Sequence, residues 1–272
     1  MCLILFHFDP DSPQPLIVAA NRDEFYARPA LAAHYWDDNP AIFAGRDLTA
    51  GGSWLGINRN GRFAALTNFS AGDEPRDYPA SRGELVANFL TSSDSAMDYI
   101  KDLTGDRYAG FNLLIYDGTE LHYTNNKGFP NQQIDAGTYG LSNAEFNTTW
   151  PKVIDGAESL SRTLTNSRPD AASQSAPKSP SIPDLLAVLG DTTPPSDDRI
   201  PTRSHLEETP IETRRALAAR FIAGDDYGTR AMTLVTVGTQ HTDVFEQQLG
   251  AGGARGSAVF ARVPRDQNQE HA

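Results

Sequence analysis

Cysteine is nearly absent from this 272-residue sequence, in which Cys2 is the only one. A single cysteine excludes an internal disulfide and a zinc site built from several cysteines. Lysine is also scarce, because only four of the 23 basic residues are lysines. No apolar run approaches the roughly 18 to 20 residues that a membrane span needs, and no basic stretch precedes a long apolar core, as in a signal peptide. We therefore expect a soluble, cytoplasmic protein without a membrane span.

The composition is acidic, with a formal net charge of -12 and an isoelectric point near 4.9. This charge argues against nonspecific binding to nucleic acid and against docking on anionic membranes. Aspartate outnumbers glutamate, which fits either a halophile with a highly saline cytosol or a GC-rich genome, and both explanations stay open. The length and the 39% hydrophobic content suffice for one large domain with a substantial core.

The first 24 residues predict a β-hairpin. The apolar runs Leu3–Phe8 and Leu16–Ala20 flank a turn cluster of Asp, Ser and Pro, and two apolar runs around such a cluster are typical of a buried hairpin. The second run ends in the tetrapeptide Asn21-Arg22-Asp23-Glu24. Because a hairpin pairs its two ends, we expect this polar cluster to lie beside Cys2.

The rest of the chain groups into blocks of strands and helices. Asn60-Gly61 between two strand-like runs is a strong hairpin signal, and Ser81 with Glu84 forms a capping box at a helix start. Blocks of this kind favour an α+β fold with mainly antiparallel sheets. Strands are predicted at 54–58, 62–68, 111–116, 120–124, 139–143, 231–237, 243–249 and 257–263, and helices at 82–90, 95–103, 150–164 and 182–189.

Other segments are expected to be irregular. Residues 29–38 are predicted as a loop, and the pattern at 214–222 fits a helix or an extended segment equally well. The Ser/Pro-rich stretch 165–183 indicates a flexible insertion, and the polar residues 264–272 indicate a disordered tail. We expect residues 1–263 to form a single domain.

Cys2 would become the first residue if Met1 were removed. Its thiol, with an unperturbed pKa of about 8.5, would then share a residue with an α-amino group of pKa near 8. A terminal amine next to a nucleophile can serve as its general base. The alternative is that Cys2 is a small buried apolar residue.

Several spaced motifs resemble the NRDE family, also called the transport and Golgi organisation family. The family in turn resembles the cysteine N-terminal-nucleophile (Ntn) hydrolases, including penicillin V acylase and bile-salt hydrolase. The resemblance implies a four-layer αββα sandwich and cleavage of non-peptide amide bonds, and it extends over residues 1 to about 263. The motifs are Met1-Cys2, Asn21-Arg22-Asp23-Glu24, Gly51-Gly52-Ser53-Trp54-Leu55-Gly56, Leu66-Thr67-Asn68, Ser81-Arg82-Gly83, Gly140-Leu141-Ser142-Asn143 and Tyr227-Gly228-Thr229-Arg230.

The resemblance also implies roles for matching positions. Cys2 would be the nucleophile and Asp23 would hold its α-amino group. Asn68 and Asn143 would supply oxyanion or amine contacts, and Arg230 would orient the nucleophile or bind a carboxylate. The structural alternatives are that the two asparagines are turn residues and that Arg230 is a buried partner of Asp23.

Arg22 departs from the hydrolase pattern, in which an arginine stands three residues before the aspartate; here that position is Ala20. On a regular strand Arg22 would face away from Asp23 unless the chain bends. A nearby arginine would lower the pKa of the thiol, so Arg22 counts among the catalytic candidates. Asn21, Glu24 and Trp54 are the candidate substrate-binding residues.

Two functions are favoured over a third, a scaffold without a ligand, because the polar cluster is dense near an apolar hairpin. The first is a hydrolase or acyltransferase that acts through Cys2 on a small amide or acyl compound and needs no cofactor. The second is a non-catalytic carrier of haem or of acyl-CoA or lipid, as the resemblance implies for relatives. No paired-histidine spacing indicates a metal site. Candidate axial ligands for haem are Met1, Cys2, His7, His34 and His122.

Overall fold

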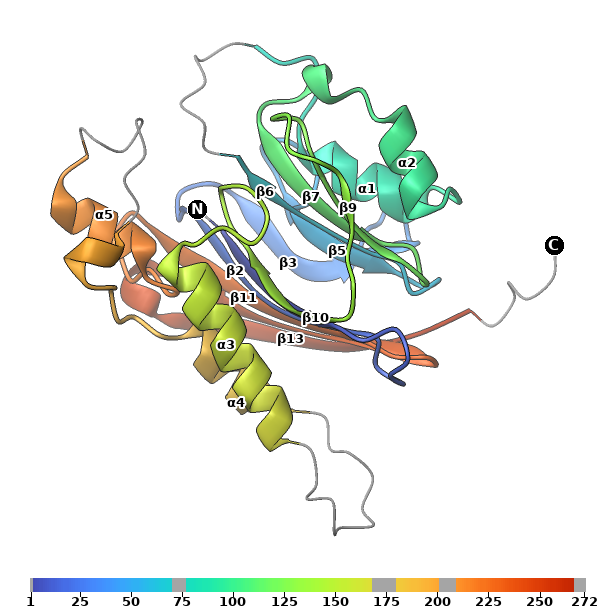
Figure 1. Ribbon diagram of the computed structural model, residues 1–272. Coiled ribbons are helices and arrows are strands. Elements are labelled where there is room, and N and C mark those ends of the chain that lie inside the picture. Colours follow the sequence, from blue (N-terminus) through green and yellow to red (C-terminus); the bar gives the residue numbers. More distant parts are fainter. Residues whose placement is uncertain (1, 70–76, 168–179, 201–208, 267–272) are drawn as a thin grey trace, which may run out of the picture.

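The computed structural model describes residues 2–69, 77–167, 180–200 and 209–266. Two sheets lie face to face (Figure 1). The first sheet has the order β10-β1-β2-β11-β12-β13 and is antiparallel throughout. Its strands are β1 Leu3–Phe8, β2 Leu16–Phe25, β10 Gly137–Leu141, β11 Tyr227–Val237, β12 His241–Leu249 and β13 Arg255–Pro264.

The second sheet follows the sequence order from β3 to β9, and its strands also pair antiparallel. Each strand is therefore connected to its neighbour by a local turn, or across α1 and α2 between β6 and β7. Its strands are β3 Ala30–Tyr35, β4 Ile42–Asp47, β5 Leu55–Asn58, β6 Phe63–Asn68, β7 Phe111–Tyr116, β8 Leu121–Asn125 and β9 Gln132–Gln133.

Helices cover the outer face of each sheet (Figure 1). Helices α3 (Pro151–Asn166) and α4 (Ile182–Leu189) pack on the first sheet. Helices α1 (Gly83–Thr91) and α2 (Ala96–Asp102) pack on the second. A shorter helix, α5, spans Ile211–Ala218. The predicted α+β fold with four αββα layers is therefore confirmed.

Alternation along the N-terminal hairpin explains the layering. Even-numbered residues of β1 and β2, such as Ile4 and Val18, belong to the core between the sheets. Odd-numbered residues, such as Leu3 and Ala19, belong to the core under α3 and α4. A third core joins α1 and α2 to the second sheet. Successive side chains of a strand point to opposite faces, so the hairpin of β1 and β2 contributes apolar side chains to both of these cores.

Most predicted elements are confirmed, with shifts of a few residues at their ends. The segment 29–38, predicted as a loop, contains strand β3, and β4 follows it. The sequence of β3 is poor in strand-forming residues, and its pairing with β4 and with Glu246 of β12 decides its conformation. The undecided segment 214–222 is helical up to Ala218.

The capping box is formed only in part. Helix α1 begins at Gly83 rather than at Arg82, and its N-cap residue Arg82 makes no side-chain cap. Glu84 still accepts a hydrogen bond from the backbone N–H of Ser81, at 3.4 Å.

The ends of two expected irregular segments are ordered. Helix α3 continues to Asn166 and α4 begins at Ile182, so both ends of the predicted insertion are helical; residues 168–179 lie outside the described part. The predicted tail begins too early, because the backbone N–H groups of Arg265 and Asp266 donate to Gln240 and Arg59. Residues 267–272 are likewise outside the described residues.

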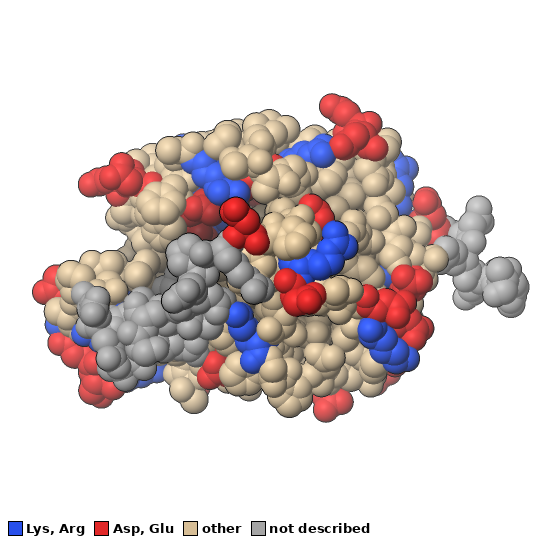
Figure 2. All heavy atoms as spheres, turned by 90° about the horizontal axis from the view of Figure 1, so that it is seen from above, with Lys and Arg blue, Asp and Glu red and all other residues tan. Residues whose placement is uncertain are grey.

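Charged side chains of both signs are interspersed on the face shown in Figure 2. Within the described residues, no helix is long and apolar enough to cross a membrane.

Candidate active site

Cys2 lies in the wall of a cavity of about 160 Å³ between the two sheets. The cavity is open to solvent at one end of the sandwich, where the polar end of β2 meets β4, the start of α1 and the end of β12. Its wall carries both basic and acidic side chains. These charged residues are Arg22, Asp23, Glu24, Arg28, Arg46, Asp47, Arg82 and Glu246.

Two hydrogen bonds fix the backbone of Cys2, and a third extends from its partner Asn143. Its N–H donates to Oδ1 of Asn143 at 2.9 Å, and Ser142 donates its hydroxyl to the Cys2 carbonyl at 2.7 Å. The side-chain amide of Asn143 donates in turn to the backbone carbonyl of Asn68, at 2.8 Å. Asn143 therefore joins the nitrogen of Cys2 to the end of β6, across the two sheets. The same nitrogen would be the α-amino group of a chain that had lost Met1.

Asp23 approaches from the helix side of the first sheet. Its side chain is buried and accepts a hydrogen bond from the hydroxyl of Thr229 at 2.8 Å. Burial raises the pKa of Asp23, against the effect of the chain's terminal amino group and of Lys152. Lys152 is itself buried in the first turn of α3, where burial lowers its pKa and Asp23 and Cys2 act to raise it.

Lys152 was not among the residues singled out from the sequence. The available signal was a lysine in the first turn of a predicted helix, where acidic residues are favoured. Its ammonium group donates to the carbonyl of Leu217 at 3.3 Å. Asp23 and Lys152 are therefore two buried groups of opposite charge, each with a hydrogen-bond partner in the protein.

Burial raises the pKa of the Cys2 thiol and so favours its neutral form. The charge of Asp23 adds to this effect, while the terminal amino group and Arg22 act in the opposite direction. In the chain with Met1, the effect of burial exceeds that of these two cations.

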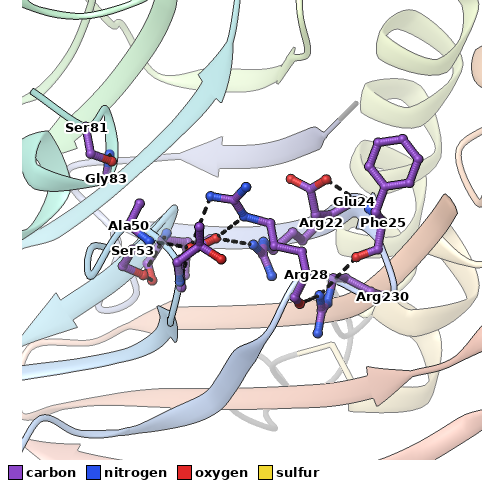
Figure 3. A network of polar contacts seen from close by, with 12 residues as sticks. Arg22, Glu24, Phe25, Arg28, Ala50, Ser53, Ser81, Gly83 and Arg230 are labelled. Atoms are coloured by element: carbon purple, nitrogen blue, oxygen red, sulfur yellow. Dashed lines mark hydrogen bonds and ion pairs between the residues drawn. The ribbon is translucent and has the colours of Figure 1, made fainter. Parts of the chain in front are cut away.

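Arg22 faces the second sheet, as strand alternation requires. Its guanidinium donates to Asp47 of β4 at 3.0 Å, whereas Asp23 faces the helices. Figure 3 shows Arg22 and Arg28 converging on the same carboxylate, and Arg28 reaches both oxygens of Asp47, at 2.6 and 3.1 Å. Burial opposes ionisation of Asp47, but hydrogen bonds from Arg28 and from the backbone of Ala50 hold its pKa below the usual value.

A bulge places Arg230 away from the cavity. The register of β11 against β2 shifts between Thr229 and Ala231, so Arg230 is the extra residue. Its guanidinium donates to the backbone carbonyls of Phe25 and Arg28 (Figure 3). Arg230 is therefore not among the residues that line the cavity, and it holds the turn after β2.

The candidate substrate-binding residues separate into two groups. Glu24 and Trp54 line the cavity. Asn21 is fully buried on the helix face, where its amide donates to the carbonyls of Leu189 and Arg220, at 3.1 and 2.7 Å. The structure thus places Asn21 in contact with the end of α4 rather than with the cavity.

Glu246 is another buried ionisable side chain that sequence reasoning missed. It is buried at the cavity wall and accepts hydrogen bonds from the backbone of Ala33 at 2.7 Å, from Gln248 at 2.7 Å and from Thr233 at 3.2 Å. Burial raises its pKa despite these hydrogen bonds. No short motif marks Glu246, because its partners come together only when the sheets pack.

The histidines considered as haem ligands lie elsewhere. His7 pairs with the hydroxyl of Thr138, His34 with the carbonyl of Ala32 and His122 with Glu120. None of the three lines the cavity, so Cys2 is the only described candidate ligand there.

Comparisons with known proteins identify the family. The family model for Transport and Golgi organisation 2 matches residues 1–251. The Transport and Golgi organization protein 2 homolog of Bos taurus is 38% identical over 255 residues, which cover 87% of this chain and 88% of the relative. The human homolog is 37% identical over 258 residues, with the same coverage of both chains.

Two solved structures resemble the overall fold at low sequence identity. Conjugated bile acid hydrolase from Clostridium perfringens gives a TM-score of 0.45 at 11% identity, covering 100% of this chain and 94% of that one. An N-acylethanolamine-hydrolyzing acid amidase ortholog from Caenorhabditis elegans gives 0.47 at 8% identity, covering 87% and 93%. On the family match and the homologues, the chain belongs to the Transport and Golgi organisation 2 family.

Proposed function

We propose that this protein is a cytoplasmic hydrolase or acyltransferase that uses Cys2 as its nucleophile on a small non-peptide amide or acyl compound. The observation that carries the proposal is the hydrogen bond from the nitrogen of Cys2 to Asn143, at 2.9 Å, in the wall of a solvent-accessible cavity. This hydrogen bond fixes the nitrogen of Cys2, which would be the general base after loss of Met1, on the same residue as the nucleophilic thiol.

The proposed reaction needs the free amine of a chain without Met1. The amine takes the thiol proton, and the thiolate attacks the carbonyl carbon to form a C–S bond and an oxyanion. The leaving group then receives the proton as its bond to the carbonyl carbon breaks, and water or another acceptor releases the acyl group from sulfur. Asn143 is committed to Cys2 and to Asn68, so the exposed side-chain amide of Asn68 is the better candidate donor to the oxyanion.

The pH dependence of Cys2 alkylation tests this proposal, since Cys2 is the only thiol. In a chain that retains Met1 we expect the alkylation midpoint above that of an ordinary thiol, because burial disfavours the thiolate. Removal of Met1 should lower the midpoint, because the amine is then on the same residue. An intact mass with Met1 retained in all of the active protein would overturn the mechanism, as would unchanged amide and thioester turnover in Cys2→Ala.

A second candidate function is a carrier of haem or of acyl-CoA or lipid. The raised pKa of Cys2 favours the acyl-CoA or lipid form of this function, because such a carrier needs the cavity but no activated thiol. In that case Cys2→Ala would leave acyl-CoA binding intact while no substrate is turned over. For haem, the thiolate of Cys2 would hold the iron from the cavity wall, and titration of haem into the protein should shift the Soret band in wild type and not in Cys2→Ala.

A further inference from the structure

Four guanidinium groups line the cavity, and three of them are occupied by carboxylates. Arg22 and Arg28 share Asp47. Arg46 makes a bidentate ion pair with Asp38, with N–O distances of 2.6 and 2.7 Å. The fourth is Arg82, for which no carboxylate partner is found among the described residues.

Arg82 is well placed to meet a ligand of Cys2. It stands at the start of α1, and one of its N–H groups donates to the carbonyl of Gly110 at 3.1 Å. A guanidinium has five N–H donors, so most of its hydrogen-bonding capacity is unused by the part of the protein that the structure describes. Burial lowers the pKa of Arg82 and a charge on Cys2 would raise it, which reflects the closeness of the two groups in one cavity.

No carboxylate of the cavity wall forms an ion pair with Arg82 among the described residues, although the charge of Glu24 acts on it through space. Asp47 already serves two arginines, and Glu24 accepts from the backbone N–H of Phe25 at 2.9 Å. Asp23 and Glu246 are buried, hydrogen-bonded to protein donors, and have raised pKa values. Arg82 is therefore the arginine of the cavity wall that no carboxylate pairs among the described residues.

We infer that Arg82 forms an anion subsite beside Cys2, so that the ligand carries a carboxylate or phosphate group close to the carbon that sulfur attacks. A guanidinium matches either anion with two parallel hydrogen bonds. The inference rests on the proposed function for the identity of the reacting atom, but anion recognition at this place does not require turnover.

Two alkylating reagents separate anion recognition from nucleophile activity. Iodoacetate and iodoacetamide both form an S–C bond with the thiolate and release iodide, and they differ in that only iodoacetate carries a charge. Their rate ratio on Cys2 cancels any change in the pKa of the thiol, because both reagents consume the same thiolate. N-acetylcysteine amide supplies the ratio for a thiol without a protein subsite.

We expect the ratio of iodoacetate to iodoacetamide rates on wild-type Cys2 to exceed that of the free thiol by roughly tenfold, the size of a charge-assisted hydrogen bond. Arg82→Gln should return the ratio to the free-thiol value, and Arg82→Lys should retain part of it. Arg59→Gln is the matched control, because Arg59 is an exposed arginine that does not line the cavity, and it should leave the ratio unchanged.

A wild-type ratio equal to that of the free thiol overturns the inference without any variant, so the test survives if Arg82→Gln does not fold. An equal fall in both rates in Arg82→Gln also overturns it, since that would show a general effect on the thiol. Protection of Cys2 from iodoacetamide by inorganic phosphate but not by acetate would assign the subsite to phosphate, and the reverse would assign it to carboxylate. A raised ratio in a protein that turns over no amide or thioester would keep the subsite and refute only the proposed reaction.

Discussion

The hydrogen bonds of Asn143 give the sharpest test of the site. Asn143→Ala removes the acceptor of the Cys2 N–H and the donor to the Asn68 carbonyl, at 2.9 and 2.8 Å, and Asn143 is buried. Each lost hydrogen bond costs about 1 kcal/mol, so the variant should lose about 2 kcal/mol of unfolding free energy. For a chain of this size that corresponds to a melting temperature lower by roughly 4 to 8 °C.

Asn125→Ala is the matched control, which shows how much stability is lost when an asparagine outside the cavity is replaced. Asn125 makes three hydrogen bonds in a more solvent-accessible place. It donates to the carbonyl of Phe129 at 2.9 Å and accepts from the backbone N–H groups of Lys127 and Phe129, at 2.8 and 3.2 Å. Because water replaces its partners, Asn125→Ala should cost about half as much or less. Thermal unfolding gives the stabilities, and the alkylation rate of Cys2 should change only in Asn143→Ala. Equal melting temperatures and equal alkylation rates in the two variants would refute the reasoning.

Three further changes test the surroundings of the cavity. Gly52→Ala should cost at least about 1 to 3 kcal/mol in denaturant unfolding, because its Cβ would lie 2.4 Å from the backbone of Gly83, whereas Gly250→Ala has no neighbour closer than 3.8 Å and should be tolerated. Asn21→Ala should lower the melting temperature without changing alkylation or ligand binding, and a selective loss of binding would instead place Asn21 at the ligand. Burial raises the pKa of Glu246, so its stabilising contribution is complete below the unfolded value of 4.5 and is lost as pH rises through the folded pKa. Glu246→Gln should therefore gain stability relative to wild type as pH rises above 4.5, and parallel pH profiles of unfolding free energy would contradict this.

Much of the fold follows from local patterns. The apolar runs of β1 and β2, the turn between them and the Asn-Gly hairpin predict the strands that the structure contains. The helices α2, α3 and α4 are confirmed within a few residues. These elements could be predicted because each has its own periodicity, turn or cap. Strand β3 could not, since its conformation depends on partners in other strands.

The site could be predicted only in part. The placement of Cys2 opposite the end of β2 follows from the hairpin register, in which Leu3 pairs with Asn21. The contact of Cys2 with Asn143 joins positions 141 residues apart, and only the pairing of β10 with β1 brings it about. The family resemblance identified Asn143 as a candidate site residue. The local sequence pattern, however, does not predict that Asn143 lies close to Cys2.

The sequence by itself determined the hairpin, the single thiol at its start and the polar cluster at the end of its second strand, because these depend on neighbours along the chain. The tertiary structure decided which charges reach the cavity. Packing of the two sheets turned Arg22 to Asp47, the bulge of β11 took Arg230 to the turn after β2, and the start of α1 left Arg82 without a carboxylate partner among the described residues. Those outcomes depend on long-range packing, in which small shifts of strand register and helix position decide where a long side chain ends.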